Sequence, residues 1–138
     1  MKIYIASTFR LAPYLTNLAA KLETLGYEIP DVWWNKDEKR AEAAPNDAAW
    51  YARPMVPAIA ERHWRTIKEC DALVLVAFHD QETKFTGANV EYGYALALGK
   101  PVLTLGQIKR SAMYANAIRC TDEEELLACL AIVGMEAR

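Results

Sequence analysis

The segment from residue 73 to residue 105 constrains the fold of this 138-residue chain more than any other. Residues 73–78 are an apolar run of the length of a buried strand, residues 87–98 have a helical pattern, and residues 102–105 are again strand-like. A strand, a helix and a strand with short connections make a parallel pair joined by a right-handed crossover. The chain is therefore predicted to be an α/β protein whose parallel sheet is covered by helices.

The rest of the chain repeats this alternation. Strand patterns cover residues 2–6, 27–33 and 117–120, and helical patterns cover residues 12–25, 54–70 and the segment after Thr121. We therefore predict one Rossmann- or flavodoxin-like domain over residues 1–138, with a five-stranded parallel sheet in the order 2-1-3-4-5 and helices on both faces. Residues 35–52 are polar and alanine-rich without a clean period, which indicates a long loop or lid.

Glu91 is the candidate reactive group. The helical pattern places it in the first turn, above the carboxyl ends of the strands at 2–6 and 73–78, where open α/β folds bind their ligands. The helix macrodipole favours a glutamate there by about 0.3–1 kcal/mol, so a purely structural role is as plausible on spacing alone. The same dipole would keep the carboxylate ionised, as a nucleophile requires, and Gly87 would let another group approach.

Other side chains are expected at the same edge of the sheet. The hydroxyl of Tyr4 points either into the core or toward Glu91 as an orienting donor. Thr8 and Arg10 follow the first strand at a helix N-terminus, where backbone amides hold phosphate, although a solvated arginine is the more common case. Trp33 could stack on an aromatic ligand, but core packing is the more common fate of tryptophan.

The two histidines are weaker candidates. His63 lies on the helix before the central strand, eight residues ahead of Asp71, and should face the end of the sheet where the crevice opens. His79 and Asp80 resemble a fragment of a metal site, but a second ligand pair at a recognisable spacing is missing from the sequence. We predict neither a metal nor a cofactor.

Charge and cysteine usage narrow the class of partner. The formal net charge is −2 with the signs interspersed, which argues against polymeric nucleic acid or an anionic membrane and favours a small-molecule ligand. The three cysteines lack C-x-x-C spacing, which indicates reduced thiols in a cytosolic protein. No apolar run approaches the length of a membrane span. We expect a cytoplasmic protein.

Three stretches carry a more specific signal: Tyr4-Ile5-Ala6-Ser7, Cys70-Asp71-Ala72-Leu73-Val74 and Gly87-x-x-x-Glu91-x-Gly93-x-Ala95-x-Ala97-x-Gly99-Lys100. Together they resemble the nucleoside 2-deoxyribosyltransferase family, which includes the 2′-deoxynucleoside 5′-phosphate N-hydrolases. The resemblance implies that Glu91 attacks C1′ of the deoxyribose and forms a covalent deoxyribosyl-enzyme with loss of the base, while Tyr4 orients the glutamate. Water or a second base would then complete a hydrolysis or a transfer, by the logic of retaining glycosidases.

The resemblance also bears on the 5′ end of the substrate and on assembly. Residues 4–10 are similar to the phosphate-holding segment of the monophosphate hydrolases, which implies substrate contacts from Ser7, Thr8, Phe9 and Arg10. Ser111-Ala112-Met113 is similar to a segment that those enzymes lend to the phosphate site of the neighbouring subunit. Both similarities imply a nucleoside monophosphate substrate and a homodimer or higher homo-oligomer.

Two positions depart from the family pattern. His63 stands where the family commonly has an aspartate that handles the leaving base, and Phe85 stands where transferases have aspartate and phosphate hydrolases have serine. An imidazole titrates near neutrality, so His63 could be the acid for the leaving base, or the change could mean a different substrate. Glu61 is a neighbouring alternative. The apolar ring of Phe85 could make neither polar contact.

We therefore predict an enzyme that cleaves the N-glycosidic bond of a 2′-deoxynucleoside or its 5′-monophosphate, by transfer or by hydrolysis. The alternative is a non-catalytic module that binds or senses a nucleotide in the same crevice, with His63 and Phe85 marking lost chemistry. The intact Glu91 weighs against that alternative. The sequence leaves open which base is recognised and whether the sugar is ribose or deoxyribose.

Overall fold

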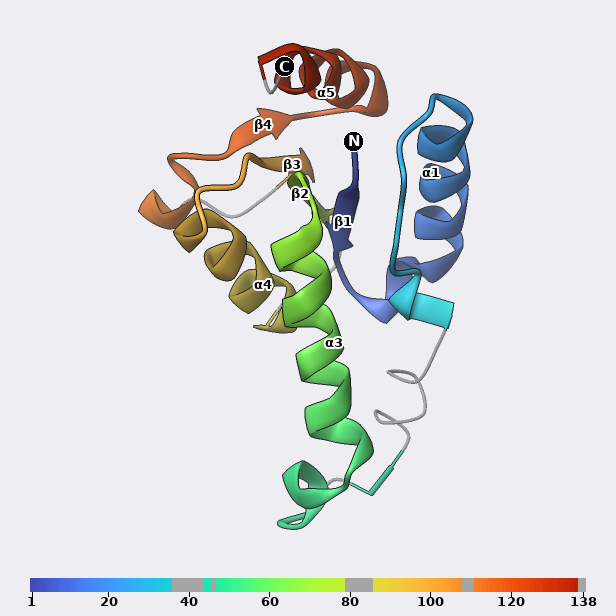
Figure 1. The fold of residues 1–138 in the computed structure, drawn as a ribbon, viewed down its shortest axis with the longest axis vertical. Coiled ribbons are helices and arrows are strands. Elements are labelled where there is room, and N and C mark those ends of the chain that lie inside the picture. Colours follow the sequence, from blue (N-terminus) through green and yellow to red (C-terminus); the bar gives the residue numbers. More distant parts are fainter. Residues whose placement is uncertain (36–43, 46, 79–85, 108–110, 137–138) are drawn as a thin grey trace.

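The computed structural model describes residues 1–35, 44–45, 47–78, 86–107 and 111–136 (Figure 1). The strands are β1 (Ile3–Ala6), β2 (Ala72–Ala77), β3 (Val102–Gly106) and β4 (Ile118–Cys120). The α-helices are α1 (Ala12–Thr24), α3 (Met55–Glu69), α4 (Thr86–Ala97) and α5 (Glu123–Glu136). Short 3-10 helices are η1 (Phe9–Leu11), η2 (Trp33–Asn35), η3 (Trp50–Ala52) and η4 (Ala112–Tyr114).

All strand pairs of the sheet are parallel, in the order β1-β2-β3-β4. Every residue of β2 is buried, because this apolar strand lies inside the sheet with helices over both faces. The carboxyl end of β3 needs a glycine: Gly106 has φ +105°, and a Cβ there would lie 2.1 Å from the carbonyl oxygen of Ala77. β2 and β3 therefore stay close together at the edge where the ligand crevice was predicted.

The prediction of five strands in the order 2-1-3-4-5 is wrong. Within the described residues, the segment 27–33 contributes a single parallel bridge, between Lys2 and Glu28, in place of the second strand. Pro30 has no N–H to donate to a neighbouring strand, and the chain then turns into η2. The other four predicted strands are present, and they lie next to one another in the predicted order.

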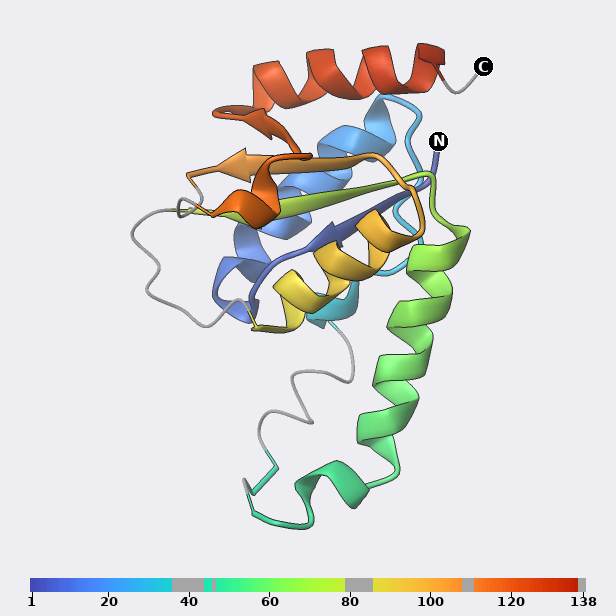
Figure 2. The same cartoon turned by 90° about the vertical axis from the view of Figure 1, so that its left-hand side faces the viewer.

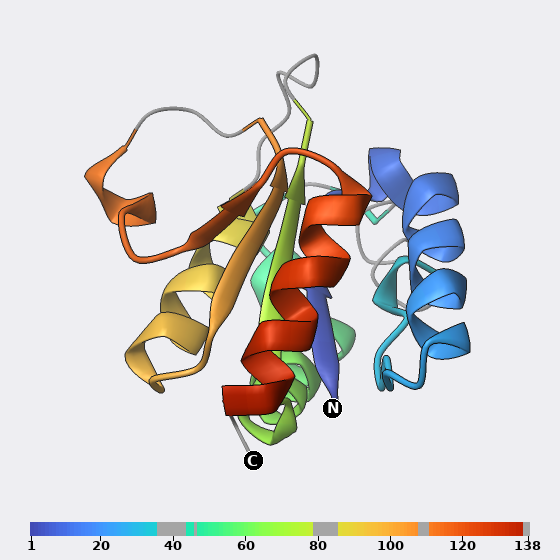
Figure 3. The same cartoon turned by 90° about the horizontal axis from the view of Figure 1, so that it is seen from above.

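The helices form two layers around the sheet. α3 and α4 cover one face, and α1 and α5 cover the other (Figures 2 and 3). Tyr14 and Lys21 of α1 tie that second layer together, because both bind the carboxylate of Glu123 on α5, at 2.7 and 2.9 Å. The predicted α/β architecture with helices on both faces is therefore correct.

The predicted loop or lid over residues 35–52 is described only in part, because residues 36–43 and 46 lie outside the described residues. Its end forms η3, which contacts α3 at the part of that helix that extends beyond the sheet (Figure 2). None of the described helices is long and apolar enough to cross a membrane.

Candidate active site

Glu91 lies on the face of α4 that packs against the sheet. The buried residues of the helix are Ala88, Glu91, Tyr92 and Ala95, which helical periodicity places on one side. Because α4 begins at Thr86, Glu91 is in the second turn, and the prediction of the first turn was wrong. The macrodipole acts within the first turn, so it does not explain how a buried carboxylate is stabilised at this position. The stabilisation must come from neighbouring side chains.

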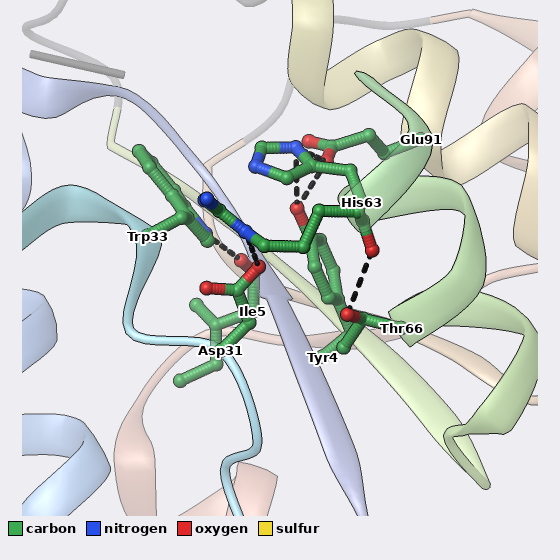
Figure 4. A network of polar contacts seen from close by, with 8 residues as sticks. Tyr4, Ile5, Asp31, Trp33, His63, Thr66 and Glu91 are labelled. Carbon is green, nitrogen blue, oxygen red and sulfur yellow. Dashed lines mark hydrogen bonds and ion pairs between the residues drawn. The ribbon is translucent and has the colours of Figure 1, made fainter. Parts of the chain in front are cut away.

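Two side chains from other elements meet the carboxylate of Glu91. The hydroxyl of Tyr4, on β1, donates to Oε2, and Nδ1 of His63, on α3, lies 2.8 Å from the same oxygen. Nδ1 is also 3.0 Å from the Tyr4 hydroxyl, so the three groups contact one another (Figure 4). They are enclosed: the side chains of His63 and Glu91 are 14% and 9% exposed, and Tyr4 is 1% exposed.

Hydrogen-bond chemistry assigns the protons in this cluster. The single proton of the Tyr4 hydroxyl is donated to Glu91, and a carboxylate only accepts. Nδ1 of His63 must then carry a proton, because otherwise its lone pair would face the lone pairs of both neighbours. Oε2 consequently accepts two hydrogen bonds, while Oε1 has no hydrogen-bond partner among the described residues.

Beside His63 on α3, Arg62 makes an ion pair that the sequence analysis did not predict. Arg62 donates from Nε to Asp31 at 3.1 Å, and the Asp31 side chain is 3% exposed. This ion pair joins α3 to the segment before η2. Trp33 follows it, with its ring centroid 6.3 Å from that of His63. Asp31 and Arg62 are 31 residues apart in the chain, and the only signal in the sequence was an acidic residue inside an otherwise apolar stretch.

Trp33 is a buried residue beside the site. It is 4% exposed, and its indole N–H donates to the carbonyl of Ile5 at 2.7 Å (Figure 4). Its ring contacts Phe9 and Trp34 edge-on. Of the two expectations for Trp33, core packing is therefore the one observed. The hydrogen bond to Ile5 fixes the Trp33 ring at the carboxyl end of β1, beside Tyr4.

The segment after β1 divides between structural and available groups. Ser7 donates to the carbonyl of Val76 at 2.8 Å and so ties the ends of β1 and β2 together. The hydroxyl oxygen of Thr8 is buried without a hydrogen-bond partner in the part of the chain that is described. Phe9 packs on Trp33, and Arg10 is exposed. Thr8 and Arg10 thus have polar groups that a ligand could use, whereas the Ser7 hydroxyl hydrogen is already donated.

The remaining predicted contacts do not meet the cluster. Ser111 caps η4 by accepting from the backbone of Met113, and the Met113 side chain is 71% exposed. η4 is held to α4 by Tyr92, which donates to the carbonyl of Met113 at 2.7 Å. Ser111 and Met113 therefore lie beside α4, and within the described residues neither of them is hydrogen-bonded to Glu91. Gly87 and Glu61 are exposed. Phe85, His79 and Asp80 lie outside the described residues.

The described residues contain no group of three or more His, Cys, Asp or Glu side chains that could hold a metal ion. The three thiols are free, and burial raises the pKa of Cys70 and of Cys120 to about 12. The chemistry available at this edge is therefore that of one buried carboxylate with two donors on one of its oxygens, beside the rings of Tyr4 and Trp33.

Comparison with known proteins decides the family. The model of the nucleoside 2-deoxyribosyltransferase family matches residues 3–130, nearly the whole chain. The chain belongs to this family. The match confirms the resemblance seen in the sequence.

Solved structures agree on the fold. A 2-deoxyribosyltransferase from Bacillus psychrosaccharolyticus is 18% identical with a TM-score of 0.67, over 91% of this chain and 90% of that one. A CMP N-glycosidase from Clostridium botulinum is 17% identical with a TM-score of 0.56, over 95% and 99% of the two chains. A conserved protein from Enterococcus faecalis is 21% identical with a TM-score of 0.56, over 93% and 95%. No curated protein sequence matches the chain.

Proposed function

We propose that this member of the 2-deoxyribosyltransferase family cleaves the N-glycosidic bond of a 2′-deoxynucleoside or its 5′-monophosphate through a covalent intermediate on Glu91. The observation that carries the proposal is the arrangement of the buried Glu91 carboxylate, with both donors on Oε2 and none of the described residues donating to Oε1. A nucleophile needs one lone pair free for attack and a fixed orientation, and this arrangement supplies both.

The proposed reaction has two steps. A lone pair of Oε1 forms a bond to C1′ while the bond from C1′ to the base nitrogen breaks, and its electron pair leaves with the base, which gains a proton. Water or a second base then attacks C1′, and the electron pair of the C1′–Oε1 bond returns to Glu91. Two displacements retain the configuration at C1′, as in retaining glycosidases.

His63 was predicted to be the acid that gives a proton to the leaving base. Nδ1 of His63 is engaged by Glu91 and Tyr4, so the only nitrogen that could act on the base is Nε2. That role stays a prediction. Tyr4 acts on Glu91 alone in the proposal, as an orienting donor.

The 5′ end of the substrate is proposed to lie at the segment after β1. The buried, unpartnered hydroxyl of Thr8 and the exposed Arg10 support this placement, because a phosphate would supply acceptors for both. Ser111 and Met113 lie on η4, and the Met113 side chain is exposed. We propose that both residues contact substrate bound in a second copy of the chain. A homodimer is therefore part of the proposal.

The experiment is an incubation of the protein with the four 2′-deoxynucleosides, their 5′-monophosphates and the matching ribonucleotides, with and without a free acceptor base. Released and exchanged bases are separated by chromatography. Release of base from at least one substrate is the expected result, and base exchange would distinguish transfer from hydrolysis. Tight binding of a nucleotide without any turnover would instead support the non-catalytic binding or sensing module.

A further inference from the structure

Both hydrogen bonds to Glu91 end on the same oxygen. The Tyr4 hydroxyl and Nδ1 of His63 converge on Oε2 from β1 and from α3, and the described residues place no donor on Oε1 (Figure 4). If Oε1 forms the bond to the sugar, Oε2 becomes the carbonyl oxygen of the resulting ester. The two donors therefore stay on the oxygen that does not bond to the sugar.

The charge on Oε2 changes during the reaction. In the free enzyme Oε2 belongs to a carboxylate and shares its negative charge, whereas in the glycosyl-enzyme it belongs to a neutral ester. Hydrogen bonds to an ionised acceptor are roughly twice as strong as those between neutral groups. The two donors therefore stabilise the carboxylate more than the ester, which makes Glu91 a better leaving group in the second step.

We propose that His63 is a positioning residue that, together with Tyr4, speeds the breakdown of the glycosyl-Glu91 intermediate by holding Oε2. The proposal rests on the covalent function above. In the breakdown step, a lone pair of water or of an acceptor base forms the new bond to C1′, and the C1′–Oε1 bond breaks. Its electron pair returns to the Glu91 carboxylate, and the attacking group loses its proton to solvent. His63 keeps its Nδ1 proton throughout.

The Nδ1 donor of His63 is present in either charge state of the ring. Tyr4 faces it from β1, Glu91 from α4 and Trp33 from η2. On α3 the adjacent Arg62 is paired with Asp31. Protonation of the ring adds charge without removing the Nδ1 proton, so the bond to the leaving carboxylate becomes charge-assisted on both sides. A doubly protonated His63 should therefore speed the breakdown of the intermediate more than a neutral one.

The test uses rapid mixing with a substrate that wild type turns over, followed by acid quench and mass spectrometry of the protein. In His63→Ala the glycosyl-enzyme should break down about 10- to 100-fold more slowly than in wild type, the effect of losing one strong hydrogen bond to a charged group. Base release in the first turnover should slow much less. His63→Asn, whose amide N–H can occupy the Nδ1 position, should restore most of the breakdown rate.

The pH dependence separates this role from a structural one. Breakdown should accelerate to the same extent in wild type and in Arg65→Ala, an exposed site on the same helix, as the pH is lowered, and His63→Asn should lose only that acceleration. This comparison needs only wild type and His63→Asn, so it holds even if His63→Ala does not fold. An unchanged intermediate lifetime in His63→Ala, or an acceleration retained in His63→Asn, would overturn the role of His63. No base release by wild type would overturn the function itself.

Discussion

Two glutamates, one on each face of the sheet, are bound by similar partners and differ in how those partners are arranged. Glu123 of α5 accepts from the hydroxyl of Tyr14 and from Nζ of Lys21, and Glu91 of α4 accepts from the hydroxyl of Tyr4 and is bonded to Nδ1 of His63. Each is thus a carboxylate with one tyrosine and one nitrogen donor. Composition alone does not tell the two clusters apart.

Geometry does tell them apart. At Glu123 each oxygen has its own donor, Tyr14 on Oε2 and Lys21 on Oε1, so the carboxylate joins α1 to α5 with both oxygens occupied. At Glu91 both donors converge on Oε2, and the side chain is 9% exposed against 29% for Glu123. A carboxylate that is buried, oriented and left with one oxygen for attack suits a nucleophile, whereas divergent bonds at a partly exposed position suit a cross-link.

The largest expected difference between the two clusters is in turnover. Glu91→Gln should lower kcat by about 10³-fold or more, because an amide cannot replace a carboxylate nucleophile of nearly the same shape. Glu123→Gln, the matched change on the other face, should keep kcat within about twofold. The measurement is steady-state release of the base. A Glu91→Gln enzyme with more than a tenth of wild-type activity would remove Glu91 from the mechanism.

Substitution of Tyr4 should also lower kcat more than substitution of Tyr14, but the difference should be smaller than the difference between the two glutamates. Tyr4→Phe removes one of the two donors on Oε2 and should lower kcat by about 10- to 100-fold, with a smaller change in KM. Tyr14→Phe removes the corresponding hydroxyl at Glu123 and should leave both constants nearly unchanged. Equal losses in the two variants, measured under the same conditions, would mean that the Tyr4 hydroxyl acts only through stability.

The pH dependence of stability should show a smaller effect, at Glu123. Hydrogen bonds from Lys21 and then from Tyr14 lower the pKa of Glu123 below its usual range. A carboxyl with a lowered pKa in the folded state stabilises the fold above its unfolded pKa of about 4.3, and that contribution disappears as the pH falls through the folded value.

Glu123→Gln should therefore reduce the free energy of unfolding by about 0.5–1.5 kcal/mol at pH 7, and the difference from wild type should shrink toward zero in acid. Urea unfolding at pH 7, 5 and 3 measures this difference. Glu124→Gln, at the exposed neighbouring position, is the control that should stay close to wild type at every pH. A difference that grows as the pH falls would contradict the assigned direction of the pKa shift.

The sequence was sufficient for the α/β alternation, because apolar runs give the strands and parallel strands bring their carboxyl ends to one edge. Local pattern left open whether the Tyr4 hydroxyl points into the core or toward Glu91, and the contact between them was implied by the family resemblance. The second strand failed because its pattern competed with Pro30 and with the burial of Trp33 and Trp34, which turn the chain into η2. A start of α4 at Thr86 was enough to move Glu91 out of the first turn.

The role of His63 could not be read from spacing. Its position on α3 predicted that it would face the crevice, but which atom it meets depends on how α3 packs against α4 and on the ion pair between Asp31 and Arg62. Contacts between residues so distant in the chain are set by tertiary packing, and no local pattern carries them. The same holds for the hydrogen bonds that make Glu123 a cross-link.

The most direct test of the central claim is mass spectrometry of the enzyme after rapid quench with a substrate that it turns over. We predict a covalent sugar adduct on the peptide that contains Glu91, formed at least as fast as steady-state turnover and absent from Glu91→Gln. Turnover with no adduct on that peptide at any time point, or an adduct on a different carboxylate, would contradict the account.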